Sequence, residues 1–255
     1  MNKLLIAFLT ILRKETTRFL RTWSQTLLPP IITAALYFAI FGYILGPKLD
    51  IMPGINYVQY VAPGLIMMGV INNAYINTVF SVYVMRFAKS IEEILVAPVP
   101  NYIILLGFTA VGIMRGIIVG FLVMIISLFF TRFQIQHVLL TLSVTILSAS
   151  LFALAGFLNA LFARKFDDTA IVPTFILTPL NYLGGIFYPI SLLPPVWHDL
   201  SLFNPILYMI NTFRYGILGI SDVNIGIALL ILIICVFILF MLNLHFLKKG
   251  TGLRT

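Results

Sequence analysis

The residues of this sequence that could do chemistry are few and are set among long apolar runs. The side chains best suited to metal binding or covalent catalysis are three histidines, His137, His198 and His245, and one cysteine, Cys235. The histidines belong to no His-Glu-x-x-His pattern, and the sequence has neither a Gly-x-Ser-x-Gly pattern nor a Gly-x-x-x-x-Gly-Lys-Ser/Thr phosphate loop. We therefore expect no catalytic, metal or nucleotide site in this chain, and any nucleotide chemistry must come from another chain.

Polar side chains form two stripes inside apolar runs. One stripe holds Asn73 and Asn77, and the other holds Thr174, Thr178 and Asn181. Side chains three or four residues apart share one face of a helix. Polar side chains within a bilayer must either bond across helices or face water. The sequence leaves two interpretations open, which are helix packing and the lining of a pathway.

Arg115 is the one charged residue well inside an apolar run. That run, 104–130, is longer than the roughly 20 residues that cross a bilayer. We therefore place Arg115 about two helical turns from the cytosolic end, where its side chain can reach the interface or pair with another group. Structural anchoring and contact with a bound molecule are both compatible with this position.

A short charged insert, 86–100, separates two long apolar runs. At about 100° per residue it forms an amphipathic helix. Its apolar face holds Phe87, Ala88, Ile91, Ile94 and Leu95, and its polar face holds Arg86, Lys89, Ser90, Glu92 and Glu93. Pro98 and Pro100 should end this helix near Val96. The pattern favours a cytosolic contact helix, with a solvated loop as the alternative.

Membrane-spanning helices must position these residues. The sequence is 61% hydrophobic and 9% charged, which is typical of an all-α polytopic membrane protein. In a soluble protein the net charge of +8 would suggest binding to nucleic acid. In a membrane protein basic residues gather in the cytosolic loops, so we first compare the charge with that rule and expect no nucleic-acid partner. We predict an amphipathic interfacial helix within 1–23, followed by six spans at 26–46, 57–83, 104–130, 138–162, 169–188 and 225–247, the first with Pro29 and Pro30 in its first turn.

The stretch 184–215 is apolar but broken by glycines and prolines. Its longest continuous piece, 200–213, is too short to span, so we expect re-entrant or interfacial helices that return on one side. Six spans with both termini in the cytosol place 12 Lys and Arg residues inside and 3 outside, with Arg115 uncounted. This distribution satisfies the positive-inside rule.

Taken together, these features resemble the ABC-2 type permeases of bacterial inner membranes. The resemblance rests on the interfacial helix, the six spans, and three motifs: Glu92–Pro98 (EEILVAP), 178–188 (TPLNYLGGIFY), and 204–208 (NPILY) followed by Phe213 and Arg214. It covers nearly the whole chain. The order and spacing of the motifs carry it more than any motif alone.

The resemblance implies a single ABC-2 type transmembrane domain over 1–255, serving as the permease subunit of an ATP-driven exporter. Such a permease pairs with itself as a homodimer and with two copies of an ABC ATP-binding subunit, which holds the ATP and Mg, so this chain has no cofactor and is not itself an enzyme. The loop 84–101 would be the coupling helix loop, with contacts from Arg86, Phe87, Lys89, Ile91, Glu92, Glu93, Leu95 and Pro98.

The resemblance also assigns the polar stripes and the broken stretch. The second and fifth spans of such permeases line the pathway, which would involve Asn73, Asn77, Thr174, Thr178 and Asn181. The re-entrant helices at 186–215 would form the external gate, together with the glycines just before them. The gate residues would be Gly184, Gly185, Pro194, Pro195, Asn204, Pro205, Tyr208 and Arg214.

The cargo and one other class of function stay open at this point. Amphiphilic, glycan, lipid-linked and drug-like cargoes are all compatible with the resemblance. A secondary transporter or channel without an ATPase partner is the alternative, but it would need an intramembrane ion-coupling group, and no Asp or Glu lies within the six predicted spans. A neighbouring gene for a protein with a phosphate loop would favour the exporter.

Overall fold

The computed structural model describes residues 3–45, 55–90, 96, 98–132 and 134–250. Regular structure in these residues is helical, and none of them forms a strand. The long helices are α1 (Lys3–Arg21), α2 (Trp23–Ala39), α3 (Tyr57–Phe87), α5 (Asn101–Ser127), α6 (Val138–Phe162) and α11 (Ile225–Lys249). The shorter ones are η1 (Ile40–Leu45), α7 (Asp168–Val172), η3 (Pro173–Leu177), α8 (Thr178–Tyr182), η4 (Ile190–Leu192), α9 (Pro195–Leu202) and α10 (Pro205–Leu218).

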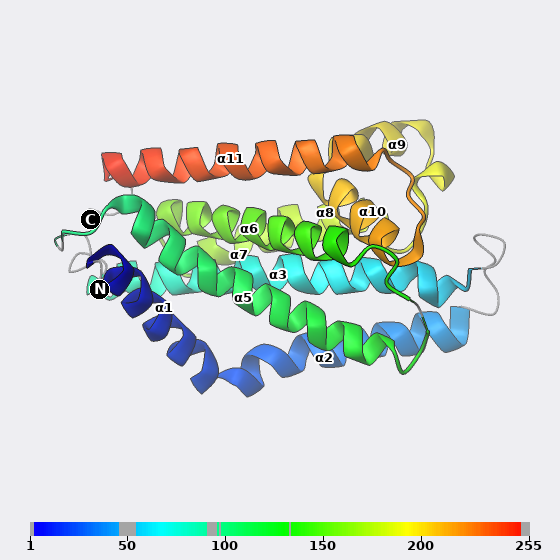
Figure 1. Ribbon diagram of the computed structural model, residues 1–255, viewed down its shortest axis with the longest axis horizontal. Coiled ribbons are helices and arrows are strands. Elements are labelled where there is room, and N and C mark those ends of the chain that lie inside the picture. Colours follow the sequence, from blue (N-terminus) through cyan, green and yellow to red (C-terminus); the bar gives the residue numbers. More distant parts are fainter. Residues whose placement is uncertain (1–2, 46–54, 91–95, 97, 133, 251–255) are drawn as a thin grey trace.

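Helix α3 is the centre of the bundle (Figure 1). It packs against α5 and α6 along its length and also touches α2 and α10, and most of its residues are buried. Helix α11 packs on α6 and α10 at the edge, and most of its side chains stay at least partly exposed. The start of α1 and the end of α11 lie at the same end of the molecule (Figure 1).

A stripe of glycines brings α5 close to α3. A Cβ added at Gly112 would lie 2.1 Å from the hydroxyl oxygen of Thr78, and one added at Gly116 would lie 2.8 Å from the carbonyl oxygen of Val70. Both distances are too short for non-bonded atoms, so the two backbones approach only because side chains are absent there. Glycines four residues apart therefore set this helix pair, as small residues do in membrane helices generally.

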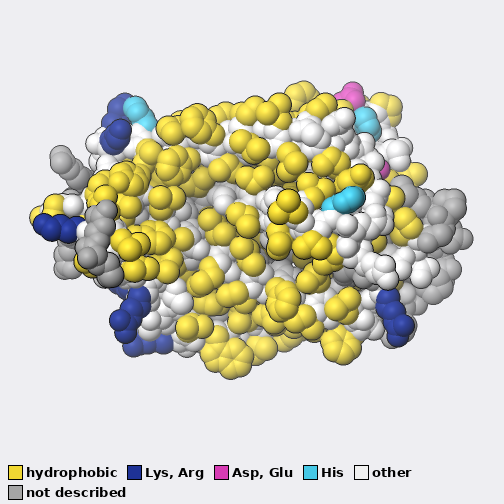
Figure 2. Space-filling model, viewed as in Figure 1, with side chains coloured by type: hydrophobic (Ala, Val, Ile, Leu, Met, Phe, Trp, Pro, Cys, Tyr) yellow, Lys and Arg dark blue, Asp and Glu magenta, His cyan; other side chains and the backbone are white. Residues whose placement is uncertain are grey.

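Five helices are long and apolar enough to cross a membrane, by length and composition, within the described residues. They agree with five of the six predicted spans, and α1 agrees with the predicted amphipathic helix. Hydrophobic side chains cover the middle of the face seen in Figure 2, and lysine and arginine side chains lie toward its two ends. This distribution is the one that a bilayer around the middle of the bundle requires.

The predicted span 169–188 differs from the other five. Helix there runs from Asp168 to Tyr182 in three pieces, α7, η3 and α8, of five residues each. At about 1.5 Å per residue this run reaches roughly 22 Å, which is less than the roughly 30 Å of a bilayer core. The prediction extended the helix too far because Gly185, whose φ of +71° suits glycine, lies in the turn that follows α8.

The first span also begins earlier than predicted. Helix α2 starts at Trp23, so Pro29 and Pro30 lie in its interior rather than in its first turn. A proline inside a helix leaves the carbonyl four residues before it without its usual donor. For Pro30 that carbonyl belongs to Thr26, and a side chain from α5 takes over the bond, as described below.

The stretch after α8 is helical in short pieces, as predicted. Helix α9 has 8 residues and α10 has 14, and both are too short to span. Helix α10 packs against α3, α6 and α11 at the end of the bundle opposite the start of α1 (Figure 1). Its buried face includes Ile206, Ile210 and Phe213.

Candidate functional site

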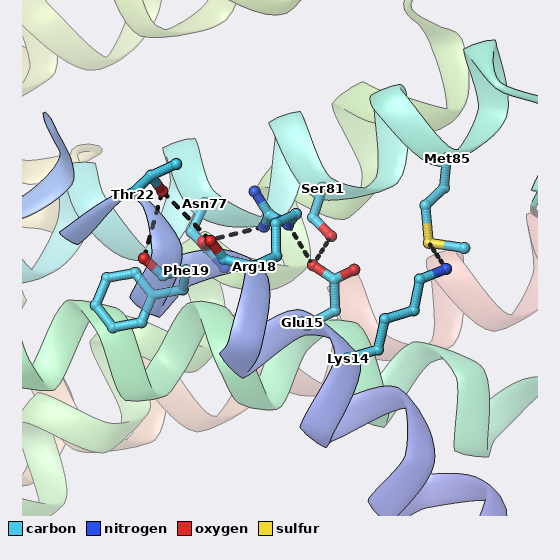
Figure 3. A network of polar contacts seen from close by, with 8 residues as sticks. All are labelled: Lys14, Glu15, Arg18, Phe19, Thr22, Asn77, Ser81 and Met85. Atoms are coloured by element: carbon cyan, nitrogen blue, oxygen red, sulfur yellow. Dashed lines mark hydrogen bonds and ion pairs between the residues drawn. The ribbon is translucent and has the colours of Figure 1, made fainter.

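The polar stripe of α3 meets charged side chains from α1. The Nε atom of Arg18 lies 2.8 Å from the Glu15 carboxylate, and Nη2 of Arg18 donates to Oδ1 of Asn77 at 3.3 Å. The hydroxyl of Ser81 donates to the same carboxylate oxygen of Glu15. Figure 3 shows these groups converging between α1 and α3. The stripe therefore bonds across helices within one chain.

The apolar pattern of the first helix predicts a buried face with Leu5, Phe8, Leu12, Phe19 and Trp23, but the face that is buried differs. Ile11, Glu15 and Phe19 are its buried residues, whereas Trp23, just after α1, is 55% exposed. Glu15 can be buried because Arg18 and Ser81 satisfy its carboxylate, and a buried charge is tolerated only when it is paired and hydrogen-bonded. The amphipathic pattern alone missed this residue, although Glu15 is the only acidic residue before Asp50.

Arg115 joins α5 to both α2 and α3. Its Nη2 donates to Oδ1 of Asn73 at 3.2 Å and to the carbonyl of Thr26 at 3.4 Å. The Thr26 carbonyl is the one that Pro30 cannot satisfy, so the arginine occupies the place of the lost backbone donor. Its guanidinium also lies 5.8 Å from the centre of the Phe19 ring. Asn73 and Asn77 thus each accept a hydrogen bond from an arginine, Arg115 and Arg18 respectively.

The second predicted stripe does not form one polar surface. The Asn181 amide donates to Oδ1 of Asn72 at 3.2 Å and is buried, which ties α8 to α3. Thr174 and Thr178 are both exposed, and the Thr178 hydroxyl donates to the carbonyl of Pro173 within its own turn. The structure therefore ties Asn181 to α3, which carries Asn73 and Asn77, and leaves the two threonines on the outside of the single chain.

Arg214 is the most enclosed charged residue at the opposite end of the bundle. Only 1% of its surface is exposed, and its guanidinium carbon lies 3.8 Å from the centre of the Tyr60 ring. Its Nη2 donates to the carbonyl of Gly185 at 2.6 Å and its Nε to the carbonyl of Tyr60 at 3.3 Å. Arg214 therefore holds α10, α3 and the glycine turn together.

The other predicted gate residues shape the same end. Asn204 caps α10 by accepting from the Ile206 N–H at 3.0 Å, and its amide donates to the carbonyl of Leu180 at 2.7 Å. The Tyr208 hydroxyl donates to the carbonyl of Leu202 at 2.7 Å. The remaining residues lie at turns and helix starts: Gly184 next to Ile206, Pro194 and Pro195 at the start of α9, and Pro205 at the start of α10.

Three of the predicted coupling residues, Arg86, Phe87 and Lys89, lie at the end of α3 and just after it, at the end of the bundle that holds the start of α1 (Figure 1). Arg86 and Phe87 are the last residues of α3, and Lys89 follows in a turn with a φ of +56°. Arg86 donates to the carbonyls of Ala160 and Ala163 at the end of α6, which lack helical donors. Its charge therefore also holds α3 to α6.

Phe87 is 81% exposed at this end. Its ring stacks on Tyr83, which in turn contacts the ring of Phe166 in the loop after α6. Val96, which has helical backbone, is 87% exposed, and Pro98 lies in a bend after it. The predicted contacts at Ile91, Glu92, Glu93 and Leu95 lie outside the described residues.

Comparisons with known proteins identify the class of this bundle. The sequence profile of the ABC-2 type transporter family matches residues 6–218. The chain belongs to the ABC-2 type transporter family. It is similar to the inner membrane transport permease YadH of Escherichia coli (strain K12), with 48% identity over 250 residues that cover 98% of each chain. It is also similar to Nodulation protein J of Sinorhizobium fredii (strain NBRC 101917 / NGR234), with 26% identity over 197 residues, or 77% of this chain and 74% of that one.

Proposed function

We propose that this chain is the permease subunit of an ATP-driven exporter in the bacterial inner membrane. It works as a homodimer with two copies of a separate ABC ATP-binding subunit, which supplies the ATP and Mg chemistry. The observation that carries the proposal is membership of the ABC-2 family over most of the chain, supported by similarity to a protein named as an inner membrane transport permease.

The proposed topology has six crossings and both termini in the cytosol. The run 169–182 supplies a crossing that is short of a full bilayer, with Asp168 outside it on the cytosolic side and the turn 183–188 completing it near the external surface. Two features support this arrangement. The start of α1 and the end of α11 lie at the same end of the bundle (Figure 1), and the loops assigned to the cytosol hold most of the basic residues. On this topology, helices α9 and α10 re-enter the membrane from the outside and form the gate. The whole chain, residues 1–255, acts as one transmembrane domain.

The proposed docking surface for the ATPase is the turn that follows α3. Phe87 and Val96 expose large apolar side chains there, and Phe166, whose ring contacts the same Tyr83 ring as Phe87, is 58% exposed. Burying one large apolar side chain contributes roughly 1.5–3 kcal/mol, whereas an exposed ion pair contributes about 0–1 kcal/mol. On this proposal, burial of these apolar side chains against the ATP-binding subunit provides most of the affinity, and charges such as Lys89 orient the subunit.

Copurification with the ATP-binding subunit tests the proposal. Phe87→Asp should reduce recovery of the complex about tenfold or more, because a lost apolar contact of this size changes affinity by that factor. Phe129→Asp is the matched control, since Phe129 is 79% exposed just after the other end of α5. Equal recovery of both variants and the wild type would contradict docking through this turn.

The proposed direction is outward, and the proposed cargo is amphiphilic, whether glycan-bearing, lipid-linked or drug-like. Uptake of the cargo into inverted membrane vesicles should require ATP and both subunits. Accumulation without the ATP-binding subunit would contradict ATP-driven export and favour a secondary transporter.

A further inference from the structure

A cavity of about 300 Å³ lies between α2, α3 and α5. Its lining combines the apolar Leu65 and Met68 with the polar Thr26, Asn72, Asn73 and Arg115, and no acidic residue is among the residues that line it. Cavities of about this size hold small ligands or parts of larger ones. It is therefore an apolar site with a cluster of polar groups and one cation.

The charge of Arg115 is uncompensated by the described residues. Both of its hydrogen bonds come from Nη2, and Nε is buried without an acceptor. The neighbouring cation, Arg18, already has the Glu15 carboxylate at 2.8 Å. A buried cation without an anion is costly, and a bound anion would repay part of that cost. The residue is 8% exposed, which leaves it within reach of the cavity.

The amides on α3 add to this charge. Asn72 accepts through Oδ1 from Asn181, and none of the described residues accepts from its NH2 group. Asn72 lines the cavity beside Asn73 and Arg115. A guanidinium and an amide NH2 that line the same cavity suit an oxyanion, because both are donors and the first is charged.

The position of the cavity fits a ligand with an apolar tail. Thr26, which Arg115 contacts, lies in the first turn of α2, next to the exposed Trp23. Aromatic side chains of this kind are enriched at the boundary between headgroups and acyl chains. Beyond that turn α2 exposes Leu28, Ile32 and Leu36, which are 44%, 55% and 58% exposed. An anionic head at Arg115 would thus leave its tail beside an apolar helix face.

We propose that this cavity binds the oxyanion headgroup of an amphiphile, a phosphate or carboxylate on an apolar tail, with Arg115 as the binding cation and Asn72 as a neutral donor. This inference deepens the proposed export function, on which it rests, by naming the charge of the cargo headgroup. Binding itself needs no ATP-binding subunit, so it can be tested apart from export.

The test is native mass spectrometry of the detergent-solubilised permease titrated with dioleoyl phosphatidic acid. Arg115→Gln should weaken apparent affinity about tenfold or more, since a charge-assisted hydrogen bond is lost. Arg115→Lys should retain most of the affinity. Arg132→Gln, which removes an exposed arginine, should bind like the wild type. Asn73→Asp should abolish binding, because it places a carboxylate beside Arg115 while keeping the acceptor oxygen.

Two further arms separate the sources of affinity. Dioleoylglycerol, which has the same tails without the phosphate, should bind at least about tenfold more weakly. Inorganic phosphate at millimolar concentration should not displace phosphatidic acid. Equal binding of the two lipids, or equal binding by Arg115→Gln and the wild type, would overturn the site. Displacement by inorganic phosphate would overturn the assignment to an amphiphile. A monodisperse elution profile of each variant shows that a loss of binding is not a loss of fold.

Discussion

Two buried arginines, Arg115 in α5 and Arg214 in α10, show how the same side chain can serve differently within one bundle. Arg214 lies 3.8 Å from the Tyr60 ring and donates to two carbonyls, and Asp222 lines the cavity beside it. Arg115 has longer hydrogen bonds, a ring at 5.8 Å and a cavity without an acidic residue. Each keeps one buried guanidinium nitrogen without an acceptor, Nη1 in Arg214 and Nε in Arg115, but only Arg214 has an acidic residue at its cavity.

The difference teaches that burial alone does not define a binding site. Both arginines are at least nine-tenths buried, at 8% and 1% exposure. What separates them is the charge nearby, because Asp222 lines the cavity beside Arg214 and no acidic residue lines the cavity beside Arg115. A buried cation without an anion nearby favours a bound counter-ion. The region around α10, which holds Arg214, therefore differs in its charge balance from the region around the start of α2, where Arg115 contacts Thr26.

The largest expected effect follows removal of Arg214. Arg214→Leu should lower the free energy of unfolding by about 4 kcal/mol, since two buried carbonyls lose a charged donor and the ring contact is lost. Arg115→Leu should cost only about 1–2 kcal/mol, because its hydrogen bonds are longer and its ring contact is more distant. Thermal unfolding in detergent measures both. A larger loss for Arg115→Leu than for Arg214→Leu would reverse the comparison.

The second largest effect on stability is expected from removing the Glu15 carboxylate, which pairs with Arg18. Glu15→Gln should destabilise the protein by about 1–3 kcal/mol, because it leaves Arg18 without its ion pair and weakens the bond from Ser81. The matched control is Arg13→Gln on the exposed face of α1. The readout is the melting temperature together with the rate of chymotrypsin cleavage in α1, whose aromatic and leucine sites both variants keep, and this rate should rise only for Glu15→Gln. A faster cleavage of the Arg13→Gln variant would place the anchor elsewhere.

Two variants of Tyr60 separate what its ring and its hydroxyl each contribute to stability. Tyr60→Leu should cost about 1–2 kcal/mol through the lost cation–π contact. Tyr60→Phe should be neutral within about 0.5 kcal/mol, because the buried Tyr60 hydroxyl has no hydrogen-bond partner among the described residues. Melting temperatures of the two variants provide the measurement. A Tyr60→Phe variant as unstable as Tyr60→Leu would show that the hydroxyl, rather than the ring, holds the arginine.

An exposed charge gives the smallest effect. The backbone N–H groups of Lys165 and Arg164 donate to the Asp168 carboxylate and hold the pKa of that carboxyl below its ordinary value. Because the folded-state pKa is lowered, the stabilisation is present at neutral pH and is lost as the pH falls through that pKa. Asp168→Asn should therefore flatten the acid side of a plot of melting temperature against pH, slightly. Asp167→Asn is the control, and the same flattening by the control would contradict this account.

The sequence predicts the long helices well because each span depends on some 20 apolar residues, so no single residue decides it. The amphipathic helix at the start of the chain, five long apolar helices at the predicted spans and short helices after α8 agree with the prediction to within a few residues. The span at 169–188 was wrong at its end, because one glycine turn at Gly185 outweighs local hydrophobicity there. The coupling, pathway and gate roles stay predictions.

The contacts between helices could not be predicted from composition or periodicity. The burial of Glu15 depends on Ser81, which is 66 residues away in the chain, and the partners of Arg115 come from α2 and α3. Such pairs follow from how helices cross, which a single sequence does not report. Readable signals did exist in the glycines at 112 and 116, which set α5 against α3, and in Pro30, which frees the carbonyl that Arg115 contacts.

ATP hydrolysis by the purified complex of permease and ATP-binding subunit, titrated with phosphatidic acid, tests the central distinction most directly. We predict that the lipid stimulates hydrolysis by the complexes with the wild type, Arg115→Lys and Arg132→Gln, and fails to stimulate the complex with Arg115→Gln. The permease without its partner should release no phosphate above a buffer blank. Equal stimulation of the Arg115→Gln complex would contradict the claim that Arg115, unlike Arg214, keeps its charge for a ligand.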